Sequence, residues 1–215
     1  VRGIAGYVEQ FSAADPEISG PGDLNIVHIA NALGDFINSE WRSTDSGFDR
    51  YLAGDDSALG AEARAGMELF YGKAGCAACH SGKLMSDQGF HALALPHFGP
   101  GRTRRFDPYV RDVGRMAESD RLEDAYRFRT PMLRNVALTG PWGHNGAYAT
   151  LEGIVRHHLD PVAALDAWRP DMVRLPADER LAKVDFIALE DSRERARLKA
   201  RVDVEPVALS DQEVT

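Results

Sequence analysis

Residues 76–80 of the chain read Cys-Ala-Ala-Cys-His, and this stretch decides the fold. A Cys-x-x-Cys-His run is the attachment signature of a c-type haem. The two thiols form thioether bonds to the haem vinyl groups, and the adjacent histidine binds the iron from the proximal side. The pattern therefore predicts one covalent haem c, held by Cys76 and Cys79, with His80 as the proximal iron ligand.

Two other uses of paired cysteines have less support. A structural zinc site needs two further soft ligands at matching spacing, and the chain has only 2 cysteines. A thioredoxin-type redox pair needs a βαβ context, which the sequence does not contain. Haem attachment is the interpretation that we favour.

The composition is that of an ordinary globular protein. The 215 residues are 44% hydrophobic and 27% charged, which allows one or two domains. The formal net charge of −8 argues against a nucleic-acid partner. No run of about 20 apolar residues is present, so no membrane span is expected. Covalent haem attachment is normally completed outside the cytoplasm, so we expect a periplasmic location.

The spacing of apolar residues predicts a mainly helical chain. Helices are expected at about 1–12, 23–41, 57–75, 133–138, 150–158, 162–168 and 177–190. Asp23 and Thr150 are the expected N-caps of two of them. Residues 42–58 and 81–120 read as loops, and a haem could order the longer one. The fold class predicted is all-α, a cytochrome c-like haem domain with long ordered loops.

Two further features of the chain suggest interpretations. The basic run Gly101–Arg105 could pair with haem propionates, although such a run is more often a solvated face. At the end of the chain, Ser210 and Glu213 form a capping box that opens a helix. Because the first helix also lacks a start signal, we expect a fragment or processed chain of a larger protein.

Several stretches around the haem motif resemble the bacterial di-haem cytochrome c peroxidases, and more closely the MauG-type di-haem oxidases. They are Ser46–Tyr51, Leu69–Phe70, Ser81–Gly82, Ser86–Asp87, Phe90–His91, Asp112–Arg115, Phe128–Thr139 and His144–Glu152. These blocks lie in the right order and cover roughly residues 40–160. The Arg-Thr-Pro-x-Leu-Arg-Asn block, at residues 129–135, is quite specific at this distance after a haem motif.

The resemblance implies a protein with two haems in two cytochrome-like domains. Residues 76–80 match the motif of the second, C-terminal haem, so the first haem and its distal acid would lie upstream of residue 1. We therefore expect residues 1–55 to be the end of the N-terminal haem domain with linker helices. Residues 56–215 would be the C-terminal haem domain, truncated at its end.

The resemblance also implies an oxidoreductase in which peroxide reacts at the first haem, outside this chain. The second haem would pass electrons, and the protein would oxidise a redox partner, such as a cytochrome or cupredoxin, or a protein side chain. No catalytic residue is then expected in this chain. Residues 72–75, Gly-Lys-Ala-Gly, lack the tryptophan of the MauG type. The alternatives are a stand-alone mono-haem electron carrier and a haem-based sensor.

The iron ligand opposite His80 has many chemical candidates. They are Met67, Met85, Met116, Met132, His91, His97, His144, His157, His158, Tyr148 and other tyrosines. In the family the ligand follows a His-(Asp/Asn)-Gly turn, as Met in ordinary peroxidases and Tyr in the MauG type. That position falls on Tyr148, and His158 is the main alternative because His–His haems are common. We expect His144 to fix its turn by hydrogen bonds.

The resemblance finally implies a calcium ion between the two haems. Its ligands in this chain would be the backbone carbonyls matching Arg129 and Pro131. A side-chain ligand would come from the missing N-terminal haem domain. Carbonyl oxygens are suitable ligands for such a hard cation.

Overall fold

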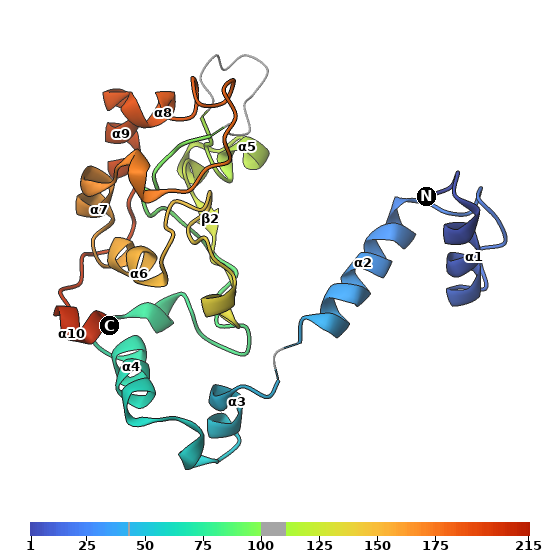
Figure 1. Cartoon of the computed structure of the whole chain (residues 1–215), viewed down its shortest axis with the longest axis horizontal. Helices are drawn as coiled ribbons and strands as arrows, with labels where there is room; N and C mark the ends of the chain where they lie inside the picture. The colour runs from blue at the N-terminus through green and yellow to red at the C-terminus, as the bar shows by residue number, and fades with distance from the viewer. Residues whose placement is uncertain (43, 100–110) are drawn as a thin grey trace. The chain divides into compact units, whose positions relative to one another are not determined.

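A computed structural model describes residues 1–42, 44–99 and 111–215 of the chain. They form two compact units, Val1–Ala58 and Leu59–Thr215, which Figure 1 shows in a colour gradient from blue to red. The basic run Gly101–Arg105 lies outside the described residues. Among the helices of the described ranges, none combines the length and the apolar character needed to span a bilayer.

The first unit consists of helices. They are α1 (Ala5–Ala14), α2 (Ile26–Glu40), α3 (Gly47–Leu52) and the 3₁₀ turn η1 (Asp56–Ala58). The N-cap of α2 is Asn25, whose side chain accepts a hydrogen bond from the Val27 amide. The prediction of Asp23 as the cap is wrong, because the Asp23 carboxylate accepts from the amides of Ser19 and Gly20 and closes the preceding turn.

The second unit is also mainly helical. Its longer helices are α4 (Ala61–Tyr71), α6 (Leu151–Leu159), α7 (Pro161–Ala167) and α9 (Ser192–Lys199). Single-turn helices are η2 (Cys76–Ala78), α5 (Met116–Ser119), η3 (Leu122–Asp124), η4 (Val136–Leu138), η5 (Pro170–Met172), α8 (Ile187–Glu190) and α10 (Asp211–Val214). One two-stranded antiparallel sheet pairs β1 (Phe90–His91) with β2 (Phe128–Arg129). This architecture confirms the predicted all-α class.

Local side-chain hydrogen bonds explain where the helices depart from the prediction. Residues 42–58 contain α3, because Ser46 and Asp49 form a capping box. Over 177–190 only α8 is an α-helix, since the Asp178 carboxylate accepts from the amides of Arg180 and Leu181 and favours a turn. Asp191 then caps α9, a helix that the periodicity did not predict.

A hydrophobic core holds α6 in place. The buried apolar side chains of this core are Ala94, Phe98, Val113, Ala125, Tyr126, Ala147, Tyr148, Ile154, Leu165, Trp168, Leu189 and Leu198. Thr150 caps α6 as predicted, by accepting from the Gly153 amide. Ile154 and His157 are the buried residues of α6. Because successive helix residues are about 100° apart around the axis, His158 points away from that buried side.

Candidate haem site

The haem-attachment motif follows directly after α4. The helix ends at Gly72, where a Cβ would lie 2.7 Å from the Glu68 carbonyl oxygen. Gly75 adopts the left-handed conformation, with φ of 69°, and leads into η2. The two cysteines, at the start and directly after η2, are free and partly buried. Burial is the main cause that raises the pKa of each thiol.

His80 is held as a ligand imidazole would be. Its Nδ1 lies 3.1 Å from the Met85 carbonyl oxygen. Because a carbonyl only accepts, Nδ1 carries the proton and Nε2 keeps the lone pair that binds a metal. Burial lowers the pKa of His80, which favours the neutral ring. The loop after the motif thus fixes both the tautomer and the charge of this residue.

His158, in helix α6, has the same arrangement as His80. Its Nδ1 lies 2.8 Å from the Ile154 carbonyl, one turn earlier in α6, so Nε2 again keeps its lone pair. The side chain is exposed to solvent. Burial by the surrounding protein nevertheless lowers its pKa, with a smaller contribution from the nearby His80. The imidazole is therefore neutral and accessible.

The rings of His80 and His158 face one another. Their centroids are 6.3 Å apart, and their planes are inclined by 58°. Two imidazoles on one metal have ring centres on the order of 6 Å apart, since each metal–nitrogen bond is about 2 Å and the ring centre lies about 1 Å beyond the nitrogen. Two thiols for attachment and two neutral imidazoles at this separation fit a six-coordinate haem c.

Tyr148 is placed differently. Its hydroxyl lies in the core, 2.7 Å from Nδ1 of His157. His157 donates from Nε2 to the Leu93 carbonyl, 2.6 Å away, so its Nδ1 accepts the phenol proton. Burial raises the pKa of Tyr148, which disfavours the tyrosinate that binds iron. The structure thus brings His158 to His80 and holds Tyr148 against His157.

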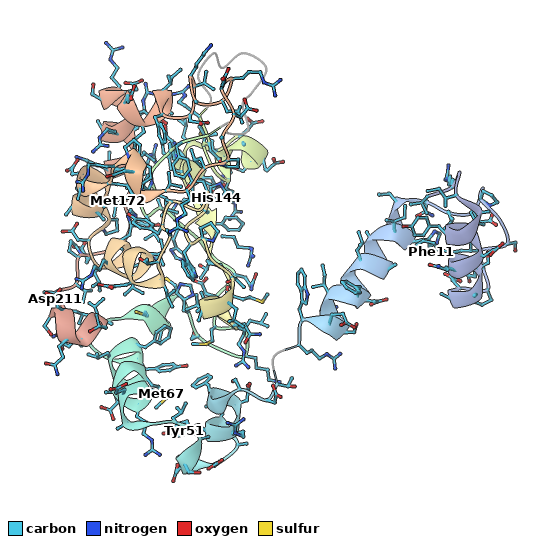
Figure 2. The ribbon with its side chains drawn as sticks, in the orientation of Figure 1. Phe11, Tyr51, Met67, His144, Met172 and Asp211 are labelled. Atoms are coloured by element: carbon cyan, nitrogen blue, oxygen red, sulfur yellow. The ribbon has the colours of Figure 1, made fainter. Side chains whose placement is uncertain are left out.

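In two other ligand candidates, His144 and His91, the Nε2 atom is bonded to a carboxylate of the protein. Nε2 of His144, which Figure 2 labels, lies 2.7 Å from the Asp112 carboxylate. The ring of His144 also contacts Phe128, with a centroid separation of 3.8 Å. This hydrogen bond agrees with the role expected for His144. His91 Nε2 lies 3.0 Å from Asp87 Oδ2.

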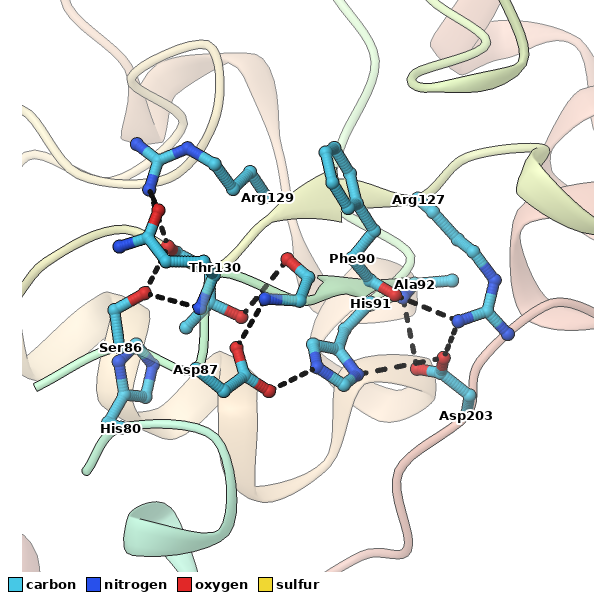
Figure 3. Close-up of polar contacts among 12 residues, drawn as sticks. His80, Ser86, Asp87, Phe90, His91, Ala92, Arg127, Arg129, Thr130 and Asp203 are labelled. Carbon is cyan, nitrogen blue, oxygen red and sulfur yellow. Dashed lines mark hydrogen bonds and ion pairs between the residues drawn. The ribbon is translucent and has the colours of Figure 1, made fainter. Parts of the chain in front are cut away.

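A polar cluster beside the motif, shown in Figure 3, was not predicted as a unit. The Asp87 amide donates to the Cys79 carbonyl at 2.7 Å, and the Asp87 carboxylate accepts from the Gly89 amide and pairs with His91. A hydrogen bond from the Thr130 side chain is the largest cause that lowers the pKa of Asp87 to about 2, followed by those from the Gly89 amide and from His91. Asp87 therefore stays charged and ties the loop after the motif to β1.

Asp203 extends this cluster from a distant part of the chain. Its Oδ1 accepts from the Ala92 amide at 3.0 Å, and its Oδ2 pairs with Arg127 Nη1 at 2.7 Å (Figure 3). Cys79, Asp87 and His91 also place one potential ligand atom each within 4.8 Å of one another. The motif blocks at 86–87 and 90–91 were visible in the sequence, but no local signal connected them with Asp203.

The two expected calcium ligands lie at the end of β2, in the case of Arg129, and directly after it, in the case of Pro131. Arg129 and Pro131 are exposed, while Thr130 between them is buried. The Thr130 carbonyl already accepts from Ser86 Oγ at 2.8 Å and from Arg129 Nη1 at 3.0 Å. The Pro131 backbone also makes a hydrogen bond to His80, which slightly opposes the effect of burial on the pKa of that histidine.

Comparison with known proteins relates this site to a family, although no protein-family model matches the sequence. The chain is 42% identical over 127 residues to the cytochrome-c peroxidase IdrP1 of Denitromonas iodatirespirans, covering 50% of this chain and 34% of that protein. It is 33% identical over 160 residues to the methylamine utilization protein MauG of Methylorubrum extorquens, and this match covers 74% of this chain and 41% of that protein. It is 35% identical over 155 residues to the cytochrome c551 peroxidase of Pseudomonas aeruginosa, and this match covers 71% of this chain and 42% of that protein.

A solved structure agrees with these relatives. The crystal structure of a MauG-like protein associated with microbial copper homeostasis matches with a TM-score of 0.50 and 26% sequence identity. The match covers 80% of this chain and 49% of that protein. The chain spans less than half the length of the three relatives named above. The chain belongs to the superfamily of the bacterial cytochrome c peroxidases and MauG proteins.

Proposed function

We propose that this chain is the C-terminal, electron-transfer haem portion of a peroxide-dependent di-haem oxidoreductase. The observation that carries the proposal is the pairing of His80 and His158, each with Nδ1 bonded to a backbone carbonyl and with ring centroids 6.3 Å apart. Two nitrogen ligands would fill both axial positions of a haem and leave none for peroxide. The site suits electron transfer, and peroxide would react at a first haem outside this chain.

The residues of the chain have separate roles in this proposal. Cys76 and Cys79 would hold the group, and His80 and His158 would bind its metal through Nε2. A haem bound there would supply a one-electron iron couple. The Met85 and Ile154 carbonyls would keep the Nδ1 proton on each imidazole and leave each Nε2 free to bind. The Asp87 carboxylate, whose pKa is about 2, places a permanent negative charge beside the motif.

The axial pair that we propose, His80 and His158, is the alternative that the sequence left open. The assignment of Tyr148 stays a prediction. For Tyr148 to bind iron, its hydroxyl would have to leave His157 and lose its proton in a buried setting. Both changes cost free energy, whereas His158 needs neither.

For the wider assembly, membership of the superfamily supports the following proposal. A first-haem domain would complete the enzyme, of which residues 1–55 would be the end. A cytochrome, a cupredoxin or a protein side chain would supply the electrons, and the location would be the periplasm. The carbonyls of Arg129 and Pro131 are the proposed calcium ligands, with the remaining ligand from the first-haem domain.

Double substitution of Cys76 and Cys79 by alanine tests the attachment of the haem. We expect the purified variant to show no covalent haem after denaturing electrophoresis and haem staining, because no thiol remains to form a thioether. The wild type is expected to carry one haem on this chain and two on the full-length protein. One haem on the full-length protein would instead support a stand-alone electron carrier.

The oxidoreductase activity has its own test on the full-length protein. With hydrogen peroxide and a reduced c-type cytochrome, we expect the wild type to oxidise the cytochrome, and His80→Ala to slow that oxidation. Peroxide consumption at the first haem should be affected less, since His80 is not at that haem. Equal activity of wild type and variant would contradict an electron-transfer role of this site.

A further inference from the structure

The two proposed iron ligands lie on separate elements, and the end of the chain touches both. His80 follows the turn η2, and His158 lies in the last turn of α6. We propose that residues 207–214, here called the C-terminal strap, position His158 opposite His80 by holding α6 to the lead-in of the haem motif. This inference rests on the proposed His80–His158 pair and adds the residues that set its geometry.

The strap is bonded to the end of α6 that carries His158. The Val207 amide donates to the carbonyl of Leu159, the residue after His158, at 2.8 Å. Arg156, two residues before His158, pairs through Nη1 with Asp211 Oδ1 at 2.9 Å. Figure 1 shows α10 beside α6, and Figure 2 labels Asp211 there. The strap therefore holds α6 on both sides of the proposed ligand.

The same strap is bonded to the segment that leads into the haem motif. Lys73, three residues before Cys76, contacts the Glu213 carboxylate with its Nζ at 2.7 Å from Oε1 and 2.9 Å from Oε2. Glu213 is itself oriented by the capping box with Ser210, since its Oε2 accepts from the Ser210 amide at 2.8 Å. Glu213 thus ties the lead-in of the motif to a helix turn that also contacts α6.

The need for such a tie follows from the way α6 is packed. Ile154 and His157 anchor its core side, but the exposed ring of His158 lies outside that core. A single exposed ion pair contributes little to stability. Here, however, two ion pairs, a backbone bond and a capping box act on one short segment. Together they would resist separation of α6 from the haem motif, and such a separation would move His158 away from an iron held by His80.

The test measures how fast an external ligand replaces His158. Cyanide is mixed with the ferric, haem-loaded protein in a stopped-flow instrument, and its binding requires that His158 first leave the iron. We expect Lys73→Gln and Glu213→Gln each to speed cyanide binding by about twofold to fivefold, as expected for the loss of one exposed ion pair. The double variant should be no faster than the faster single variant, because both remove the same contact.

Matched variants separate positioning from general effects of charge. Lys183→Gln removes an exposed lysine elsewhere in the same unit and is expected to bind cyanide at the wild-type rate. Asp211→Asn removes the Arg156 pair and should speed binding as Glu213→Gln does. His158→Ala sets the upper limit of the rate, because no side chain has to leave.

The outcomes distinguish the two proposals. If the wild type binds cyanide as fast as His158→Ala, His158 is not the ligand, and the proposed pair is overturned together with the strap. If the wild type is slow and His158→Ala is fast, but the variants at Lys73, Asp211 and Glu213 match the wild type, the strap alone is overturned. Acceleration in those three variants, with Lys183→Gln unchanged, supports the strap.

Discussion

Substitution of His158 by alanine is expected to convert the ferric haem from a six-coordinate low-spin state to a high-spin state. The reason is that the variant lacks the imidazole whose ring lies 6.3 Å from that of His80. The reduced variant should also bind carbon monoxide, which a wild-type haem with two strong ligands binds slowly. Visible absorption spectra of the ferric, reduced and carbonylated forms measure both effects.

Tyr148→Phe is the matched variant for this prediction. It removes only the hydroxyl that donates to His157, and we expect the ferric spectrum to stay that of the wild type. Loss of a buried hydrogen-bond partner should lower the free energy of unfolding by about 1–3 kcal/mol. A changed spectrum in Tyr148→Phe together with an unchanged one in His158→Ala would reverse the assignment of the ligand.

The second large effect is expected at Glu194, which is completely buried in α9. Its Oε1 accepts from the Tyr126 hydroxyl at 2.7 Å. Its Oε2 pairs with Arg197 at 3.0 Å and with Arg111 at 3.5 Å. The carboxylate thus joins α9 to the chain on either side of α5. Removal of this buried carboxylate would leave its arginine partners without a compensating charge and the Tyr126 hydroxyl without its acceptor.

Glu194→Ala is therefore expected to lower the free energy of unfolding by about 3–5 kcal/mol. Guanidinium titration of the haem-loaded protein, followed by circular dichroism, measures the change. Glu190→Ala, at an exposed position of the neighbouring α8, should change the free energy of unfolding by less than about 0.5 kcal/mol. Equal effects of the two substitutions would show that the buried network does not stabilise the fold.

The sequence predicted well the features that short-range chemistry determines. The Thr150 cap of α6 and the capping box at Ser210 and Glu213 both depend on residues a few positions apart. The mainly helical class followed from apolar periodicity over whole helices. Departures such as the cap of α2 arose where two polar side chains competed for one helix start, Asp23 and Asn25.

The choice between neighbouring residues of α6 depended on packing that periodicity does not reveal. His157 and His158 are adjacent in the sequence, but the core takes His157, which bonds to Tyr148 and to the Leu93 carbonyl. His158 is thereby turned toward His80. In the sequence, Tyr148 follows the turn that carries the ligand in the family. Only the three-dimensional structure shows that its hydroxyl is bonded to His157.

The partners of the site from distant parts of the chain were also beyond prediction. Asp203 bonds to the Ala92 amide and to Arg127, and Glu213 bonds to Lys73. Each of these acidic residues lies in an exposed or polar segment that resembles many others in the sequence. Only the fold distinguishes them, because it brings the end of the chain to the haem motif.

The identity of the axial ligands is tested most directly by low-temperature electron paramagnetic resonance of the ferric wild-type protein, with resonance Raman on the same sample. We predict a low-spin signal typical of two imidazole ligands and no tyrosinate vibrations. A spectrum with tyrosinate vibrations that disappear in Tyr148→Phe would contradict the pairing of His80 with His158.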